Sequence, residues 1–415
     1  MTNYKGLLLG SVAASVLAAG ALVTPAQADG SAVFGHKKGK FYAKSKDGNF
    51  SILPGFNIQV DYNAAIRDDA FTAASRADTR RFNVRRGRAA IKGRAGSPNL
   101  TYAISFDVTT NTGTTNGIFD TNVNYKFIPE VQVRAGQFKP IGSPVDNGGS
   151  SSSWLVDDPN GTTGGSSIGP SREVGMAVHG KVAKMLQYEL TISNGQGFRG
   201  ATASEESGWS FGIRFEPFGR YGNFVQPDYT AKNKLRMQVH AAVKKVQGVQ
   251  SGNGEVGTYA TTVNAGEANS LYWVGAVGMK YAGLALSGLY QHANMQVGED
   301  VQNENNGRRS YNWMLGASYM VIPKKIGVTA IWSVRDNDVA HSNAGNNNDG
   351  SVIDDDTTIA RQWGVGAFYL FRGHAHKLHA SWDRINTKVN ADETDGGNGI
   401  VQSDDTLKLR WQVQF

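Results

Sequence analysis

The most distinctive chemistry in this sequence lies in a run of basic residues between positions 80 and 94. The run contains no acid, and its cations are Arg80, Arg81, Arg85, Arg86, Arg88, Lys92 and Arg94. Guanidinium and ammonium groups form charge-assisted hydrogen bonds with carboxylate and phosphate oxygens, so this stretch is suited to attracting anions. The alternative is that these cations form ion pairs with acids on nearby strands, such as Asp107 and Asp120.

Other patterns that could do chemistry are incomplete. Residues 175–181 match the start of a phosphate-binding loop, but Val182 replaces the required Ser or Thr and the segment alternates like a strand. His374 and His376 are spaced to bind a metal, but no third ligand accompanies them. Neither an H-E-x-x-H nor a G-x-S-x-G motif occurs. We therefore predict no catalytic residue, no metal site and no cofactor, and we expect that the chain is not an enzyme.

Alternation of apolar and polar residues is the dominant pattern of the chain. The C-terminal segment is a clear case, because Leu407, Leu409, Trp411, Val413 and Phe415 share one face of a strand. Most such segments run about 9–13 residues, close to the length of about 9–11 expected for a tilted membrane strand. The sixteen segments lie near 50–62, 80–94, 99–109, 117–127, 130–138, 172–181, 185–193, 208–216, 234–246, 270–280, 282–293, 309–320, 326–335, 361–371, 377–385 and 405–415.

The connections between these segments alternate in length. Short turns follow most even-numbered segments, and long loops rich in Gly, Asn, Ser and Asp follow most odd-numbered ones. Aromatic residues stand at the segment ends beside the short-turn side, namely Phe127, Phe215, Tyr281, Tyr319, Phe371 and Phe415. This combination is typical of outer-membrane barrels. The connection 217–233 is the exception, since it is long where a short turn is expected, and the sequence does not explain it.

The sequence therefore predicts an all-β fold, a sixteen-stranded antiparallel transmembrane β-barrel with short periplasmic turns, long extracellular loops and an inward-folded third loop. Residues 1–28 are predicted to be a signal peptide, because an apolar stretch follows Lys5 and ends at the cleavage motif Ala26-Gln27-Ala28. Residues 29–49 are polar and basic and are expected to form a periplasmic N-terminal segment, with the barrel over 50–415. The chain has no Cys, so we expect closed ladders of backbone hydrogen bonds to stabilise it.

The basic segment at 80–94 fits such a barrel only if its alternation slips by one residue. An extra residue at Arg86-Gly87, a β-bulge, places Phe82, Val84, Ala89 and Ile91 outward. The slip turns five of the cations towards the lumen, namely Arg81, Arg85, Arg88, Lys92 and Arg94. This is favoured because a charge on the lipid face costs about 2–4 kcal/mol at the midplane. The predicted pore-lining residues are Arg81, Arg85, Arg88, Lys92, Arg134, Arg172, Arg214, Arg236, Lys408 and Arg410.

Four ordered motifs also resemble a known family. They are KDGNFS at 46–51, GFNIQVD at 55–61, FNVRRGR at 82–88 and GQFKPIG at 136–142. Together they resemble the phosphate-selective porin O and P family, over roughly the first third of the mature chain. The resemblance implies a sixteen-stranded, homotrimeric, anion-preferring porin with arginines and lysines in its constriction.

The third long loop, residues 139–171, is expected to fold inward and narrow the pore, since long loops of this kind are often functional. Its candidate constriction residues are Asp146, Trp154, Asp157 and Asp158. The three acids against Lys139 give the loop a charge of −2, which departs from the basic constriction that the resemblance implies. Cations on the opposite wall would then orient polar solutes as they pass, with modest selectivity.

These features predict an outer-membrane porin for passive diffusion of small hydrophilic solutes, with a preference for anions such as phosphate. The chain is expected to be exported to the bacterial outer membrane, to contact lipid and lipopolysaccharide, and to bind no nucleic acid. The alternatives are a general, weakly selective porin, a structural or adhesive barrel whose long loops do the work, and a barrel hydrolase.

Overall fold

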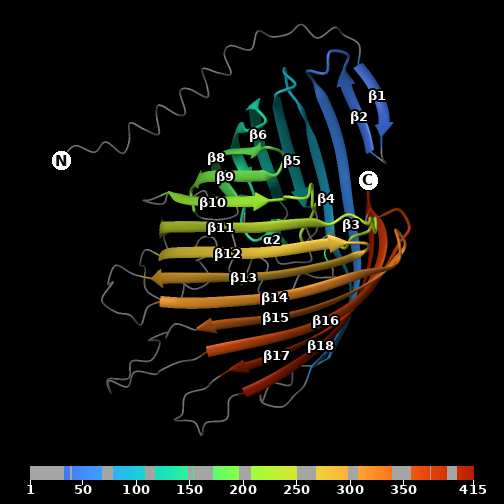
Figure 1. The fold of residues 1–415 in the computed structure, drawn as a ribbon, viewed down its shortest axis with the longest axis vertical. Helices are drawn as coiled ribbons and strands as arrows, with labels where there is room; N and C mark the ends of the chain where they lie inside the picture. Colours follow the sequence, from blue (N-terminus) through green and yellow to red (C-terminus); the bar gives the residue numbers. More distant parts are fainter. Residues whose placement is uncertain are drawn as a thin grey trace, which may run out of the picture.

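The chain forms a closed, all-β barrel in the computed structural model, which describes residues 32–37, 40–67, 78–107, 117–147, 153, 172–195, 207–249, 268–297, 307–338, 357–373, 375–389 and 400–415. These residues contain eighteen strands in one antiparallel sheet, and sixteen of them, β3 to β18, close the ring (Figure 1). The remaining two, β1 (Ala32–Lys37) and β2 (Lys40–Ser45), form a hairpin that continues into β3.

The barrel strands follow chain order around the ring, each antiparallel to the next. The first eight are β3 (Ser51–Arg67), β4 (Thr79–Arg94), β5 (Leu100–Asp107), β6 (Gly117–Ile128), β7 (Val131–Phe138), β8 (Glu173–Val182), β9 (Leu186–Ser193) and β10 (Gly208–Phe215). The second eight are β11 (Arg236–Val249), β12 (Ala268–Tyr281), β13 (Leu284–Val297), β14 (Gly307–Ile322), β15 (Ile326–Asp338), β16 (Thr357–Leu370), β17 (His376–Val389) and β18 (Ile400–Gln414). Each predicted segment corresponds to one of these strands, so the predicted fold class is confirmed.

The ring closes where β18 pairs with β3, for example Leu409 with Tyr62. A buried ion pair crosses this seam, because Arg410 donates from Nε and Nη2 to the carboxylate of Asp61 at 2.7 and 2.6 Å. The amide of Gln59 extends the contact by donating to Gln412 Oε1 at 2.7 Å. Closure leaves the barrel without a free edge strand, so the backbone of every barrel strand has a neighbour on both sides.

The barrel is apolar outside and polar inside, the reverse of a water-soluble sheet. Along β18, Leu409 and Trp411 point outward and are exposed, whereas Arg410 and Gln412 point inward and are buried. The same inversion holds on β14, where Trp313 and Leu315 are exposed while Asn312 is buried. Such an outer face suits hydrocarbon rather than water. Among the described residues, no helix has the length and the apolar character that a membrane span requires.

The short turns gather at one end of the barrel, where β1, β2 and the C-terminus also lie (Figure 1). The aromatic residues predicted at the strand ends beside these turns are all exposed on the outer face: Phe127, Phe215, Tyr281, Tyr319, Phe371 and Phe415. They form the girdle expected at a membrane interface. The β1–β2 hairpin lies in the segment 29–49, which the sequence predicted to be a polar, basic N-terminal segment without strands.

Strand β4 contains the predicted bulge, one residue earlier than expected. Gln59 pairs with Arg86 and Val60 pairs with Val84, so Arg85 is the extra residue. Arg86 therefore takes an inward position, where it is buried and donates to Gln59 Oε1 at 2.8 Å. Phe82, Val84 and Ile91 are exposed on the outer face, as the slip requires.

The third long loop starts inside the barrel. After β7, residues 139–147 follow the inner wall and include the short helix α2 (Pro144–Asn147). The amide of Ile141 donates to Glu189 at 2.8 Å, and the His240 ring bonds the carbonyl of Gly142. Ile141 also fits over Gly212, where an added Cβ would lie 2.2 Å from its Cγ2. The first part of the loop is thus held on the wall by polar and apolar contacts.

Candidate functional site

The connection between β10 and β11, residues 216–235, folds into the barrel from the short-turn end. Tyr221, Phe224 and Val225 are each 1% exposed. They join one apolar cluster with Val145 of α2 and with inward residues of the wall, namely Ala242, Tyr272, Val274, Ala276, Leu289, Met314 and Ile331. The connection that the sequence left unexplained is therefore an inner layer that covers β11 to β15.

This inner layer explains why β12 is apolar on both faces. Its outward residues, such as Trp273 and Val277, face the outside, while Val274 and Ala276 face the connection. Gly278 makes room for the closest approach, because an added Cβ there would lie 2.4 Å from the Tyr221 hydroxyl. Burial raises the pKa of the Tyr221 phenol, which is neutral at pH 7 even when exposed, and the ring therefore adds no charge to the lumen.

Polar contacts fix the connection at several points. Lys280 of β12 donates to the carbonyls of Tyr221 and Asn223, at 3.4 and 2.8 Å, and its ammonium lies 4.0 Å from the Tyr221 ring centroid. Arg236 forms an ion pair with Asp228, which also accepts a bond from the amide of Gly283 at 3.1 Å. These interactions satisfy an irregular backbone that lies inside the barrel, as burial requires.

Backbone hydrogen bonds also join the connection to the neighbouring short turns. The backbone amide of Glu216 donates to the carbonyl of Met185 at 2.9 Å, in the turn between β8 and β9. The amides of Ala282 and Lys324 donate to carbonyls of the connection at 2.9 and 3.0 Å. The connection is therefore tied to three other turns at the same end of the barrel.

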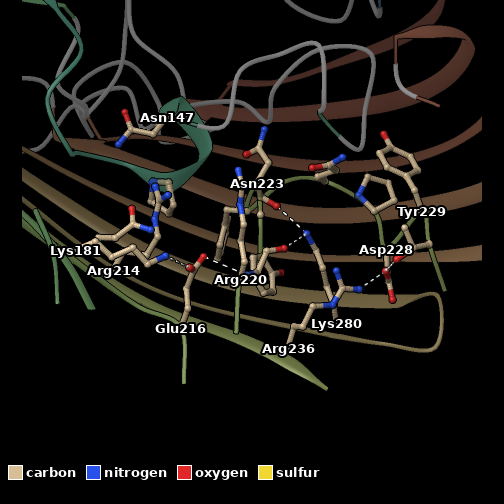
Figure 2. Close-up of a pocket in the computed structure, with 18 residues that line it drawn as sticks. Asn147, Lys181, Arg214, Glu216, Arg220, Asn223, Asp228, Tyr229, Arg236 and Lys280 are labelled. Atoms are coloured by element: carbon tan, nitrogen blue, oxygen red, sulfur yellow. Dashed lines mark hydrogen bonds and ion pairs between the residues drawn. The ribbon is translucent and has the colours of Figure 1, made fainter. Parts of the chain in front are cut away.

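A cavity of about 720 Å³ lies between this connection, α2 and the wall formed by β8 to β12 (Figure 2). Five basic side chains line it against two carboxylates, which gives a formal net charge of +3. The charged residues are Lys181, Arg214, Arg220, Arg236, Lys280, Glu216 and Asp228. Asn147 of α2 also lines the cavity and lies above Lys181 and Arg214 in the view of Figure 2.

The cations of this cavity differ in how they are neutralised. Lys181 pairs with Glu216 at 3.3 Å, and Arg236 pairs with Asp228. Within the part of the chain that the structure describes, Arg214 and Arg220 form no ion pair, and the buried Nε of Arg214 has no hydrogen-bond partner. Guanidinium groups that form no ion pair are suited to binding oxyanions, because they present several fixed donors to carboxylate or phosphate oxygens.

Of the ten predicted pore-lining residues, the structure brings Arg214 and Arg236 to the cavity. Other predicted residues lie on the inner wall and form ion pairs with residues of neighbouring strands or loops. Arg88 pairs with Asp107 at 2.8 Å and Arg172 with Asp120 at 2.9 Å, and both guanidinium groups lie over the ring of Phe119. The alternative that cations of the 80–94 run pair with nearby acids thus describes Arg88, whereas Asp120 pairs with Arg172, which lies outside that run.

The remaining predicted cations are placed as follows. Arg134 pairs with Glu189 at 2.8 Å, Lys408 with Asp383 at 3.3 Å, and Arg410 with Asp61 across the closing seam. Arg81 and Lys92 lie on β4 with exposed side chains, and Arg85 occupies the bulge. Among the loop candidates, Asp146 lies in α2, but its side chain is outside the described residues, as are Trp154, Asp157 and Asp158.

The sequence analysis missed Lys181, Arg220 and Lys280 as lining residues. The alternation on β12 could have predicted that Lys280 points inward, because it lies on the same face of the strand as Tyr272, Val274 and Ala276. Arg220 carried none, since it belongs to the irregular connection. Residues 175–181 lie in β8, as expected for a chance match to a phosphate-binding loop, and no group of three His, Asp or Glu side chains suited to a metal occurs among the described residues.

No protein-family profile and no curated protein sequence matches the chain. Its structure is similar to the outer membrane channel DcaP of Acinetobacter baumannii, with 13% identity over 89% of this chain and 99% of that one and a TM-score of 0.52. It is also similar to OmpF of Salmonella typhi, solved in complex with daunomycin, with 14% identity over 89% of this chain and 98% of that one and a TM-score of 0.50. At these identities the likeness establishes a shared barrel fold.

Proposed function

We propose that this protein is a porin of the bacterial outer membrane, through which small hydrophilic solutes diffuse passively with a preference for anions. The cavity inside the barrel carries the proposal, because its lining has a formal net charge of +3 and contains two arginines, Arg214 and Arg220, that form no direct ion pair with any described residue. The apolar outer face and the aromatic girdle support placement in a membrane. The shared fold with outer-membrane channels supports the same location.

The mechanism needs no chemical step. A narrow lumen has low-dielectric walls, which focus the field of the lining charges and raise the local concentration of counter-ions. Arg214 and Arg220 therefore lower the barrier for an anion and raise it for a cation. The ion-paired cations of β4 to β8, such as Arg88 and Arg172, contribute less net charge, but they keep the wall polar and hydrated.

The finer parts of the proposal follow from the sequence. The resemblance to the phosphate-selective porin O and P family supports phosphate as one permeant anion and a homotrimer as the assembly. The N-terminal segment supports export by a signal peptide. The girdle supports contact with lipid and lipopolysaccharide.

The test is single-channel recording of the purified protein in a planar bilayer under a KCl gradient. We expect a reversal potential that favours chloride, and partial block when phosphate is added. The double variant Arg214→Gln/Arg220→Gln should shift the reversal potential towards potassium. Its matched control, Lys184→Gln/Arg372→Gln, removes the same charge from two exposed short turns and should leave the potential unchanged.

The outcomes separate the proposal from its alternatives. An unselective current that phosphate does not block would indicate a general porin. Absence of any open-channel current would overturn the porin proposal in favour of a structural or adhesive barrel. Hydrolysis of lipid or peptide in detergent would indicate an enzyme.

A further inference from the structure

We propose that the β10–β11 connection, residues 216–235, is a second constriction of the pore, built from the short-turn end, and that it limits the size of the solutes that pass. The inference rests on the proposed function, since it assigns a role within a diffusion channel. The third loop alone would narrow a pore from the opposite end. Here two segments from opposite ends meet inside the barrel.

The start of the third loop and the β10–β11 connection meet inside the barrel. Val145 of α2 belongs to the same buried apolar cluster as Tyr221, Phe224 and Val225 of the connection. Pro144 and Asn147 line the same cavity as Arg220 and Asn223 (Figure 2). The start of the third loop and the connection therefore form one continuous inner layer, and the cavity lies along its edge beside β8, β9 and β10.

The rigidity of the connection is the second argument. An irregular segment of this length limits pore size only if it holds its place. Lys280, Asp228 and Arg236 fix its middle through ion pairs and bonds to carbonyls, and three neighbouring turns fix its backbone. The buried side chains of Tyr221 and Phe224 add apolar contacts with the wall. Such contacts place the connection among the more stable parts of a fold rather than among the frayed loops.

The barrel wall is shaped to accept the connection, which is the third argument. Inward positions on each of β11 to β15 supply apolar residues to the cluster with the connection, where a water-filled lumen would have polar residues. Gly278 lies directly under Tyr221, with no room for a Cβ. Gly275 belongs to the outward face of the same strand and has nothing within 4 Å of its would-be Cβ, so an added methyl group there would not touch the connection.

The cavity left beside this layer sets the class of solute. Its volume of about 720 Å³ is within the range of about 300–1,000 Å³ found for sites that hold small organic molecules. Arg220, which the connection itself supplies, stands with Arg214 and Lys181 in the lining. The geometry thus favours small organic or inorganic anions bearing carboxylate or phosphate groups.

The first experiment removes the constriction and measures the pore. Replacing residues 217–233 by an Asn-Gly turn should raise the single-channel conductance severalfold and admit larger neutral sugars in liposome swelling. Tyr221→Ala/Phe224→Ala should act in the same direction with the backbone intact, which covers the case in which the replacement does not fold. Unchanged conductance and sugar cutoff in a folded variant would overturn the inference while leaving the channel function in place.

A second experiment tests the position of the connection without any current. The chain has no native Cys, so single cysteines can be labelled selectively with a maleimide. Val225→Cys is expected to react slowly, whereas Phe218→Cys, whose native side chain is 47% exposed, should react quickly. Adding Gly278→Ala should speed labelling of Val225→Cys, and adding Gly275→Ala should not. Equal labelling of both cysteines in the parent chain would overturn the inference even if the protein conducts ions.

Discussion

At the scale of single residues, arginines of this chain have two different roles. Arg410 is 1% exposed and its guanidinium binds both oxygens of Asp61 across the closing seam. Arg214 has no ion-pair partner among the described residues and lines the cavity. The first role is structural, because the pair is neutral and inaccessible, and the second leaves a charge that a passing solute can meet.

Neutralising Asp61 should therefore destabilise the barrel rather than change its selectivity. Asp61→Asn leaves the Arg410 charge buried without its partner, a change that costs about 3–5 kcal/mol in comparable sites. We expect a lower free energy of unfolding in urea titrations of protein folded into lipid vesicles.

A matched control is Asp405→Asn, also on a barrel strand, because its pair with Arg384 is longer, at 3.9 Å, and more exposed. An exposed pair of this kind is worth about 0–1 kcal/mol. Equal destabilisation by the two substitutions would contradict a special role for the seam pair.

Sequence patterns could place these arginines on the inner face but could not divide them by role. The alternation on β18 predicted that Arg410 points inward. Whether a carboxylate lies opposite depends on which strand closes the ring and in what register, and Asp61 is 349 residues away. The sequence therefore predicted the positive charge of these residues and their place on the inner face, but not which acids they pair with.

At the scale of elements, glycines mark where inner segments touch the wall. Gly212 lies under Ile141 at the start of the third loop, as Gly278 lies under Tyr221. Neither glycine needs a positive φ at these positions, so the close approach alone accounts for the residue type.

Gly212→Ala should push the start of the third loop away from the wall and into the lumen. Overpacking of this kind costs about 1–3 kcal/mol. We expect a lower single-channel conductance, since the loop moves towards the open part of the pore. Gly275→Ala, in open space, is the control and should conduct like the parent. A conductance unchanged by Gly212→Ala would show that the loop absorbs the methyl group elsewhere.

Sequence reasoning found the sixteen strands because each has an outward apolar face that repeats every second residue. It failed at the β10–β11 connection because nothing local specifies that backbone. Lys280 and Arg236, on strands, fix it through contacts with Asn223 and Asp228. The apolar inward positions of β12, such as Val274, were a visible sign that something covers this wall.

At the scale of the whole molecule, the charges of the lumen act together as a field. The cavity charge of +3 should favour anions most strongly when few ions screen it. The Debye length is about 10 Å at 0.1 M salt and about 3 Å at 1 M. We therefore expect the chloride-to-potassium permeability ratio to fall as the KCl concentration rises at a fixed gradient. A ratio independent of salt would point to size or direct coordination rather than the field.

The closing seam also sets the order of assembly. β3 is the first barrel strand to be synthesised and β18 is the last, and the amide of Phe56 donates to the carbonyl of Phe415 at 2.7 Å. Until β18 arrives, β3 has one unpaired edge, which is a template for pairing with other chains. Pairing of β3 with β18 is slow, because the two strands are far apart in the sequence. The newly made chain therefore carries an edge that is open to pairing with its neighbours for the whole interval between synthesis and ring closure.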